Sequence, residues 1–538
     1  MTKFLVLSLS LLSLSANSAY LVKKTIKNNK ENIISVKEID LKIRKIKVLK
    51  SIRESISEKV KTENTIYKEI LYPKNLLPKS LETKLIPKNQ KTFWAGSEVR
   101  KISGSTKDTN RITITILGDG YTEAEKNKYF DDVNRIVDDM FKEVTFKSYL
   151  PLFNIYAVFT PSAESGITDL QTKRTAFDLY RSPRGSKRGV MPGNRSAIER
   201  ALELVDVHTD YPIIIANDDF YGGLGGRYAI TTRSLTSGSM VLRHELGHNF
   251  SNVGEEYDGG QVYSGANFSR STDVPWKHWN NYDGGKIHVH KAEFLTGAYI
   301  WQDLGLKDYS VKFNFPYKSG YSYDLKISSV GWETEQDVKV ELDGKELELD
   351  GVFTSDRSFF RTKKVAIHDG EHLLTIKDHA RDGNNVLAYA NGYAYPDSYD
   401  FTYGKVGAFN VFDENQNERG YRPTHNQCLM RDMRSKIFCP VDQESIWLRF
   451  LGRISLIDSV KENNKVYSIE TLPVGVQTIK WFEIERRNRV ELVQFRDKKI
   501  ADFSNINRGK FEVEVSMKHP EIRIETEETT DIYEFKIR

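Results

Sequence analysis

The stretch "VLRHELGHNF", residues 241–250, tells the most about the fold. His244 and His248 are four residues apart, so on a helix they lie on one face, about one turn from each other. Both imidazoles could then bind one metal ion, with Glu245 beside the open coordination position as a general base. The same pattern also occurs by chance on ordinary helices, and the surrounding sequence has to decide between these two interpretations.

A catalytic zinc ion needs a third protein ligand. The continuation "NFSNVGEEYDGG" offers Glu255 and Glu256, and Asp258 as a weaker candidate. A continuous helix would carry Glu255 about 10.5 Å beyond His248, too far for one ion, so the chain must turn back. Gly254 is suited to such a turn. We expect Glu256 to be the third ligand, with Glu255 as the alternative.

The stretch "YGGLGGRYAITTRS" precedes this helix and predicts a glycine-rich turn followed by a strand over residues 227–232. The glycines are not in the order of a phosphate-binding loop. Zinc peptidases use a strand in this position to bind the backbone of a substrate by strand addition. The residues expected to align a substrate are Arg227, Tyr228, Ala229 and Ile230.

Alternating strand and helix patterns surround these motifs. "RITITILGDGY" is typical of a buried strand, and the helix after it begins with a capping box formed by Thr122 and Glu125. Strands that alternate with helices indicate an α/β layer. We expect an α/β (α+β) zincin-like catalytic domain, with an inserted β-sandwich and a C-terminal β domain where strand-turn-strand patterns dominate.

The expected organisation follows changes in composition and pattern along the 538 residues. It comprises a signal peptide over 1–19, a basic segment and linker over 20–92, the catalytic domain over 93–305 and 405–455, the β-sandwich insert over 306–404, and the C-terminal β domain over 456–538.

The N-terminus has the pattern of a secretory signal: Lys3, an apolar stretch over residues 4–14 and small residues over 16–19. It predicts a secreted, periplasmic or envelope protein, and no later apolar run is long enough to predict a transmembrane span. Residues 20–92 hold 19 Lys and Arg against 8 Asp and Glu, and could be a pro-segment or a surface contact. Part of this segment, over 51–71, is spaced like a helix.

Cys428 and Cys439 are the two cysteines of the chain. In an exported protein, two cysteines 11 residues apart most simply form a local disulfide. Zinc ligation by the pair is the alternative, although the spacing matches no common structural zinc site. Weaker metal candidates are a second site at His288 and His290, and a calcium loop at Asp413, Asn415 and Asn417, where Glu418 replaces the required glycine.

Several ordered motifs together resemble the IgA-peptidase family of bacterial zinc metallopeptidases. They are "ITILGDGYTEAE", "FNIYAVFTPSAESGI", "GGLGGRYAITT", "HELGHNFSNVGEEYDGG", "VPWKHW" and "YRPTHNQCLMR", and the similarity covers roughly residues 95–280 and 405–450. The resemblance implies a metzincin-like domain with one catalytic zinc ion, His244 and His248 as ligands and Glu245 as general base. It also implies that many relatives have no known substrate, and for this chain we expect a protein or glycoprotein substrate.

The chain departs from the family pattern just after the helix. The family's Asp-Glu-Tyr is Glu255-Glu256-Tyr257 here, and the retained Glu-Tyr half is a further reason to favour Glu256. Typical metzincins place a glycine and a ligand where this chain has Ser251 and Gly254. Met430 is either the methionine turn beneath the metal or an ordinary core methionine. Tyr257 could stabilise an oxyanion, although plain packing is the simpler role.

We therefore expect a secreted zinc endopeptidase. The alternative is an exported β-rich adhesin or glycan-binding protein with a structural or vestigial metal site, which would not need Glu245. The formal net charge of +5 gives no field of the kind that attracts nucleic acid, so no nucleic-acid partner is expected.

Overall fold

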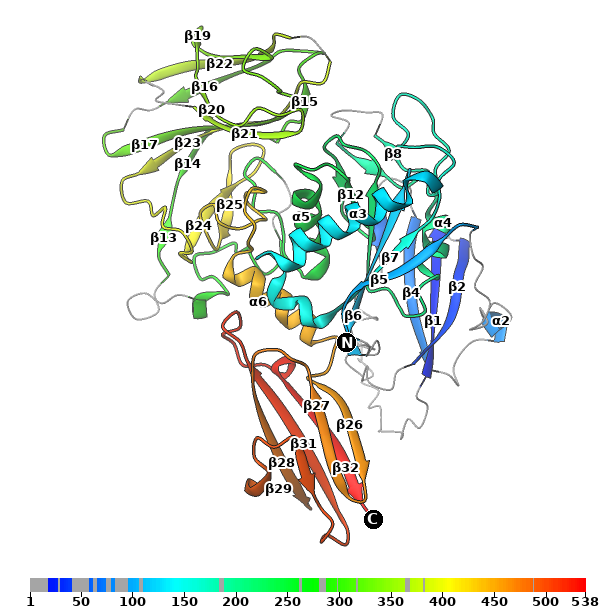
Figure 1. Cartoon of the computed structure of the whole chain (residues 1–538). Helices are drawn as coiled ribbons and strands as arrows, with labels where there is room; N and C mark the ends of the chain where they lie inside the picture. The colour runs from blue at the N-terminus through cyan, green and yellow to red at the C-terminus, as the bar shows by residue number, and fades with distance from the viewer. Residues whose placement is uncertain are drawn as a thin grey trace, which may run out of the picture.

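The computed structural model describes most of the chain, and it is a mixed α and β structure, rich in strands, with several sheets and few helices (Figure 1). The described residues are 18–27, 30–40, 58–60, 65–73, 79–82, 95–105, 110–182, 188–260, 264–279, 287–297, 299–315, 318–362, 368–380, 383–486 and 488–538. No described helix is long and apolar enough to cross a membrane.

A six-stranded sheet forms the centre of the molecule, in the order β11-β12-β10-β6-β7-β5. The four inner strands are parallel, and the two edge strands, β11 and β5, run antiparallel to their neighbours. The strands are β5 (Glu98–Ser103), β6 (Ile112–Asp119), β7 (Phe153–Phe159), β10 (Tyr211–Ala216), β11 (Gly223–Leu224) and β12 (Ala229–Thr232). The predicted α/β alternation is present in this sheet.

Alternate residues of the central strands enter two different cores. Ile114 and Ile116 face one core and Leu117 faces the other, because successive side chains of a strand point to opposite faces. The first core also contains residues of α3 (Lys126–Val137), α5 (Gly238–Phe250) and α6 (Pro440–Leu451), and the second contains those of α4 (Arg195–Leu202). Helices therefore cover both faces of the sheet, as its buried strands require.

The capping box predicted before the first long helix is present. The carboxylate of Glu125 accepts hydrogen bonds from the backbone N–H and the hydroxyl of Thr122, each at 3.0 Å. The helical segment begins as a short 3₁₀ turn over Glu123–Glu125, continues as α3 and ends in a π-helical turn over Asp138–Lys142.

An aromatic cluster holds the C-terminal end of α5 against the sheet. The fully buried ring of Phe250 lies 4.8 Å from Tyr211, 5.5 Å from Phe153 and 5.1 Å from Phe450, measured between ring centroids. These partners come from β10, β7 and α6, so three elements fix the position of α5.

The N-terminal segment forms a four-stranded sheet, β2-β1-β4-β3, beside α4. Its strands are β1 (Ser18–Lys27), β2 (Lys30–Asp40), β3 (Glu58–Val60) and β4 (Thr65–Pro73), and a short helix α2 (Lys79–Glu82) follows. The buried Lys23 ammonium lies 3.3 Å from Glu199 and 3.1 Å from Glu203, which joins this sheet to α4.

Two sequence predictions fall on this segment. The helix predicted over 51–71 is wrong where the structure describes it, because β3 and β4 lie there and β4 pairs with β1 along nine residues. Strand pairing satisfies the backbone of both partners and outweighs a local helical spacing. Residues 1–17 of the predicted signal peptide lie outside the described residues, and residues 18 and 19 begin β1.

Residues 293–396, which we call the insert, form two sheets with a shared core that contains Phe313, Ile327 and Leu374. Their strands are β14 (Glu293–Thr296), β15 (Gln302–Asp303), β16 (Tyr309–Phe315), β17 (Tyr321–Val330), β18 (Val338–Leu342), β19 (Lys345–Glu346), β20 (Leu349–Gly351), β21 (Arg357–Thr362), β22 (Gly370–Asp378) and β23 (Val386–Pro396). The strands begin before the expected boundary at 306, because β14 pairs with β23.

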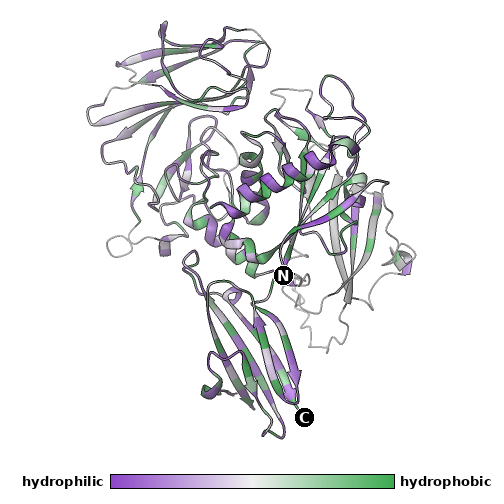
Figure 2. Cartoon of the chain, viewed as in Figure 1, coloured by the Kyte–Doolittle hydropathy of each residue, from purple (hydrophilic) through white to green (hydrophobic). Residues whose placement is uncertain are grey.

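Residues 457–537 form two further sheets, in the orders β26-β27-β30 and β29-β28-β31-β32. Apolar and polar residues alternate along these strands (Figure 2), and the apolar side joins the core beneath α5 and α6. The strands are β26 (Ile457–Asn463), β27 (Val466–Thr471), β28 (Val476–Glu485), β29 (Asn488–Glu491), β30 (Ile500–Asp502), β31 (Gly509–Lys518) and β32 (Thr530–Ile537). A buried ion pair of 2.6 Å between Arg111 and Asp458 also links them to the central sheet.

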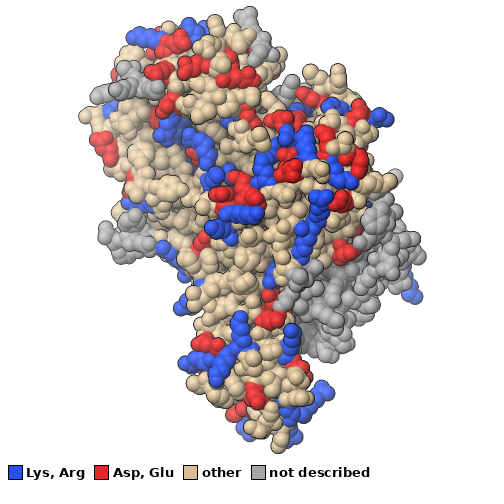
Figure 3. Space-filling view, viewed as in Figure 1, with Lys and Arg blue, Asp and Glu red and all other residues tan. Residues whose placement is uncertain are grey.

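The remaining strands form two small sheets: β8 (Tyr180–Arg181) with β9 (Val190–Met191), and β13 (Val289–His290) with β24 (Ala408–Phe412) and β25 (Glu418–Arg422). Basic and acidic side chains are intermixed on the face of the molecule that Figure 3 shows.

We expect Phe250→Ala to lower the free energy of unfolding by about 3–5 kcal/mol, because it leaves a cavity among the rings of Tyr211, Phe153 and Phe450. Leu235→Ala is the matched control: this leucine, near the start of α5, is 75% exposed and its loss should change stability by less than about 0.5 kcal/mol. Denaturant unfolding followed by circular dichroism measures both. Equal stability of the two variants would show that Phe250 does not anchor α5.

Candidate metal centre

Helix α5 presents two histidines to one carboxylate. The Nε2 atoms of His244 and His248 each lie 3.3 Å from the carboxylate of Glu255. A tetrahedral ion with bonds of about 2.0–2.1 Å to nitrogen and oxygen separates its ligand atoms by about 3.3–3.4 Å. The three side chains therefore have the spacing of ligands to one zinc-sized ion, and among the described residues they form one of three groups able to hold a metal.

Backbone carbonyls orient both imidazoles. The Nδ1 atom of His244 lies 3.4 Å from the carbonyl oxygen of Leu429, and that of His248 lies 3.0 Å from the carbonyl oxygen of Val253. A carbonyl can only accept a hydrogen bond, so each Nδ1 must carry the proton and donate it. Nε2 is then the ring nitrogen that faces Glu255 and that can bind a metal once any proton on it is released.

The protonation of Glu255 also suits a metal ligand. Burial alone would raise its pKa, but the two imidazoles hold the pKa well below its usual range. Burial lowers the pKa of His248, and the hydrogen bond to Glu255 outweighs it and raises the pKa to about 9. The Oε2 atom of Glu255 makes no hydrogen bond within the described part of the chain and lies 3.3 Å from Nε2 of His244. A buried ionised carboxylate between two imidazoles is chemistry that a cation satisfies.

In the structure Glu255, the alternative candidate, lies beside the two histidines, and the expected Glu256 does not. Glu256, the expected ligand, points away from the histidines, and its Oε1 accepts a hydrogen bond from Asn267 at 3.0 Å. Glu255, the alternative, lies against them. Successive side chains of an extended segment point to opposite sides, so only one of these neighbours can face the imidazoles. Asp258, the weaker candidate, forms a buried ion pair of 2.5 Å with Arg431.

The chain reversal starts earlier than Gly254. Helix α5 ends at Phe250, and Ser251 already has extended backbone angles. Val253 then forms an antiparallel bridge with Gly265. A Cβ atom at Gly254 would lie 2.2 Å from the carbonyl oxygen of Ser264, so Gly254 permits close packing of two backbone segments instead of making the turn.

A second close approach positions Glu245. A Cβ atom at Gly225, just after β11, would lie 2.2 Å from the Oε2 atom of Glu245. The glycine thus leaves room for the carboxylate at the edge of the central sheet. Burial raises the pKa of Glu245, while His244 and His248 oppose the shift. A carboxylate with a raised pKa is suited to exchanging protons near neutral pH.

Met430 packs beneath α5. A Cβ atom at Gly247 would lie 2.9 Å from its sulfur and 2.7 Å from the ring of Phe438. Gly247 therefore makes room for these two side chains, and not for the metal as such. The Met430 carbonyl accepts a hydrogen bond of 3.1 Å from the backbone of Glu256, which ties the methionine to the segment that carries Glu255. Met430 therefore packs in the core against α5, and its role as a methionine turn stays a prediction.

The predicted substrate strand is not a free edge. Strand β12 pairs with β10 on one side and with β11 on the other. Tyr228 donates a 2.7 Å hydrogen bond to Glu199, and Arg227 lies 3.5 Å from the same carboxylate. Both side chains therefore interact with Glu199 of α4. Ala229 and Ile230 are fully buried. These four residues therefore offer no free edge for strand addition, and the outer edge of β11 is itself occupied at Gly223, whose N–H donates to the carbonyl of Arg188 at 3.0 Å.

Aromatic side chains of the insert lie along one side of the metal centre. The ring of Tyr257 lies 5.6 Å from His244 and stacks on Tyr299 at 5.1 Å, so it packs between the histidine and the insert. Val241 of α5 joins an apolar cluster with Val330 of the insert. The insert therefore forms part of the site, which no motif of the sequence indicated.

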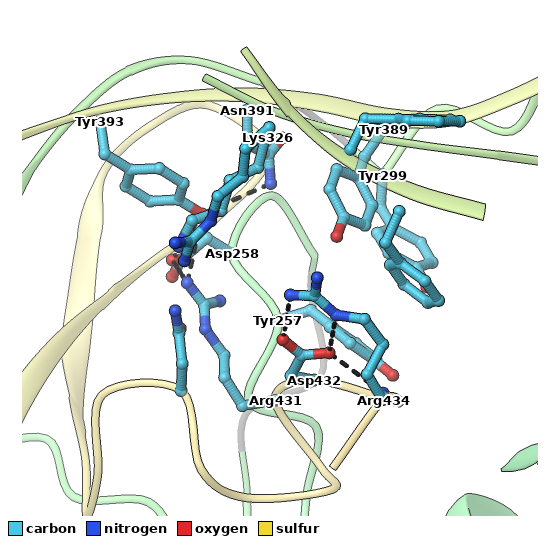
Figure 4. Close-up of a pocket in the computed structure, with 14 residues that line it drawn as sticks. Tyr257, Asp258, Tyr299, Lys326, Tyr389, Asn391, Tyr393, Arg431, Asp432 and Arg434 are labelled. Carbon is cyan, nitrogen blue, oxygen red and sulfur yellow. Dashed lines mark hydrogen bonds and ion pairs between the residues drawn. The ribbon is translucent and has the colours of Figure 1, made fainter. Parts of the chain in front are cut away.

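A pocket opens behind Tyr257, between the insert and the loop that follows Met430 (Figure 4). Ion pairs line its floor: Arg434 binds Asp432 with two nitrogen atoms, and Arg431 binds Asp258. Lys326 of β17 enters from the roof, and burial lowers its pKa to about 7. The other lining residues are Tyr299, Phe359, Phe360, Arg361, Tyr389, Asn391, Tyr393 and Asn426.

The predicted disulfide is not formed in the structure. Cys428 and Cys439 are both free and buried. The thiol of Cys428 donates to Asp442 at 2.9 Å and accepts a hydrogen bond from the Cys439 backbone at 3.3 Å.

The weaker metal candidates have other surroundings. His290 stacks on Phe409 at 4.6 Å, and neither it nor His288 joins a metal-binding group among the described residues. Asp413 lies in the hairpin turn between β24 and β25, where one oxygen of its carboxylate accepts from the backbone of Asn415 and Asn417, each at 2.9 Å. This arrangement is a capped turn and not a calcium loop.

Comparison with known proteins gives one informative match. Residues 101–282 match the family model described as IgA Peptidase M64. None of the curated proteins matches the chain. Solved structures that match include a β-glucuronidase from an uncultured Clostridium sp., 10% identical with a TM-score of 0.12, covering 52% of this chain and 39% of that one. Another is a β-D-glucuronidase from Dictyoglomus thermophilum, 10% identical with a TM-score of 0.09, covering 53% and 42%.

This chain therefore spans less than half the length of either glucuronidase. At such TM-scores the two structures carry no argument about fold or function.

We expect Gly225→Ala to lower kcat/KM about 100-fold, because the new methyl group displaces the Glu245 carboxylate, and misplacing a reacting group by about 1 Å has an effect of this size. The fold should persist, since the obstructed atom is the end of a flexible side chain. Gly189→Ala is the control, because its methyl group meets atoms no closer than 3.5 Å. Wild-type kcat/KM in Gly225→Ala would contradict the assignment.

We expect Glu255→Gln to weaken zinc binding by more than the roughly 10–100-fold loss typical of an outer-shell partner, because it removes a ligand. Glu245→Gln is the control, since it alters a carboxylate of the same helix α5 that is not a ligand. Competition with a chelator measures both affinities. Unchanged zinc affinity in Glu255→Gln would contradict Glu255 as the third ligand and would favour Glu256.

Proposed function

We propose that this chain is a zinc-dependent endopeptidase with a zincin-like catalytic domain, because residues 101–282 match the model of the IgA Peptidase M64 family. The family is one of peptidases, which are hydrolases with protein substrates. The observation that carries the proposal is the convergence of His244, His248 and Glu255 at 3.3 Å, with Glu245 on the same helix. Two imidazoles with one carboxylate are a ligand set of catalytic zinc, and thermolysin-type sites use it.

A bound zinc ion would supply a Lewis acid and a water whose pKa is lowered to about 7. The residues of the chain perform the rest. Glu245 accepts the proton of the attacking water and returns it to the leaving amine. The carbonyls of Leu429 and Val253 keep the two imidazoles in the required tautomer. Tyr257 and the insert cover one side of the site and limit the access of solvent.

The chain just after β11 is the segment that would lie along a substrate. Strand β11 ends at Leu224, and Gly225 beside Glu245 follows directly. The outer edge of β11 itself is occupied, because the N–H of Gly223 donates to the carbonyl of Arg188. A substrate held beside Gly225 would lie at the general base, and the side chains of the insert would contribute to selectivity.

The sequence pattern of residues 1–19 supports export of the protein by a signal peptide, to the cell envelope or beyond. The rival function, an adhesin with a structural metal site, has no use for a glycine that clears space for Glu245. The geometry around Gly225 therefore favours the enzyme.

We expect Glu245→Gln to keep zinc bound and to lower the rate of peptide hydrolysis by about 10²–10⁴-fold, because the amide cannot accept the proton. Glu335→Gln, an exposed position in the insert, should retain full activity. Cleavage of a casein and immunoglobulin panel, with and without a chelator, measures the rates. Full activity in Glu245→Gln, or activity that resists the chelator, would contradict the mechanism.

A further inference from the structure

A second group of metal-ligating side chains lies behind the candidate metal centre, on the other side of the backbone of residues 255 and 256. Glu256, Cys428, Cys439 and Asp442 each offer one ligand atom, and the four atoms lie within 4.8 Å of one another. All four residues are at most 1% exposed. They come from three places in the fold: the segment after α5, the loop that carries Met430, and the start of α6.

Two carboxylate oxygens of this cluster lack partners. The Oε2 atom of Glu256 and the Oδ1 atom of Asp442 are buried and make no hydrogen bond within the described residues. A buried ionised oxygen without a partner is costly, and a protonated one would be a donor without an acceptor. The other oxygen of each carboxylate is bonded: Asn267 donates to Glu256, and the Cys428 thiol donates to Asp442. The free oxygens need a cation or a proton acceptor.

We propose that Glu256, Cys428, Cys439 and Asp442 bind a second divalent ion of the zinc class, in a closed structural site. Thiolates and carboxylates are both zinc ligands, and four protein ligands with no open position are typical of a structural site. Bonds of about 2.3 Å to sulfur and 2.0–2.2 Å to oxygen separate a sulfur from an oxygen ligand by about 3.5 Å. The observed 2.9 Å between Cys428 Sγ and Asp442 Oδ2 requires only a small separation of these two atoms.

Burial raises the pKa of all four groups, so an ion would have to displace their protons, and several neighbouring groups would help to hold the resulting negative charge. Cys439 is the N-cap residue of α6, and Asp442 lies in its first turn, where the helix dipole stabilises negative charge. The backbone N–H of Cys439 donates to the sulfur of Cys428 at 3.3 Å. Arg431 donates a 2.9 Å hydrogen bond to the backbone carbonyl of Glu256, which places a fixed positive charge beside the cluster. These groups offset part of the excess negative charge of two thiolates and two carboxylates around one divalent ion.

The second ion would hold the parts of the catalytic centre in place. Cys428 directly precedes Leu429, whose carbonyl orients His244, and Glu256 directly follows the ligand Glu255. The backbone hydrogen bond from Glu256 to Met430 joins the two segments. An ion bound to Cys428 and Glu256 would therefore fix both segments at once. The site does not depend on the proposed peptidase activity.

The test counts metal and thiols in the full-length chain, purified without a reducing agent. We expect about two zinc ions per chain by elemental analysis. The variant His244→Ala/His248→Ala should keep about one, because the second site does not use these histidines. After denaturation in a chelator without reductant, this variant should show two titratable thiols. Loss of all zinc from it, or the absence of titratable thiols because the cysteines form a disulfide, would overturn the proposal.

Cobalt substitution gives an independent reading of the ligands. Cobalt loaded into His244→Ala/His248→Ala should give the charge-transfer absorption of thiolate–cobalt bonds, and its absence would refute ligation by the cysteines. The matched variant Cys428→Ser/Cys439→Ser should keep about one zinc ion and lack this absorption. If that variant does not fold, the histidine variant alone decides. A chain without peptidase activity would leave these results unchanged, so the two proposals can fail separately.

Discussion

The reversal of the chain after α5 is the constraint on which the candidate site depends. A helix can bring two histidines to one side, but a third ligand on the same helix would lie too far along the axis. The extended backbone at Ser251 and the bridge between Val253 and Gly265 solve this problem by returning the chain beside the helix. The Glu255 carboxylate then reaches both imidazoles within 3.3 Å. Gly254 allows the returning segment to pack closely against Ser264.

Much of the remaining structure serves to hold α5 against this reversed segment. The rings around Phe250 fix the end of the helix to the central sheet and to α6. Met430 and Phe438 occupy the space that Gly247 leaves beneath it. The insert covers the opposite side through Tyr257 and Tyr299. Core packing, and not the metal alone, therefore determines where the two histidines point.

The sequence was most informative where the determining contacts are local. The spacing of His244, Glu245 and His248 is a property of one helix, and so is the capping box at Thr122; both could be predicted from neighbouring residues. The choice between Glu255 and Glu256 could not, because it depends on the side from which an extended segment approaches. The contact between Gly225 and Glu245 could not be predicted from the sequence either, because it joins the end of a strand to a separate helix. The free thiols of Cys428 and Cys439 depend on hydrogen bonds that no spacing rule describes.

The carbonyl that orients His244 belongs to Leu429, 185 residues further along the chain and beyond the whole insert. A ribosome that has just completed α5 has therefore made both histidines and Glu245 but not the support that directs them. The arrangement of the candidate metal centre can form only after the insert and the following loop have been synthesised. The order of the chain thus delays maturation of the site until the polypeptide has grown past Leu429.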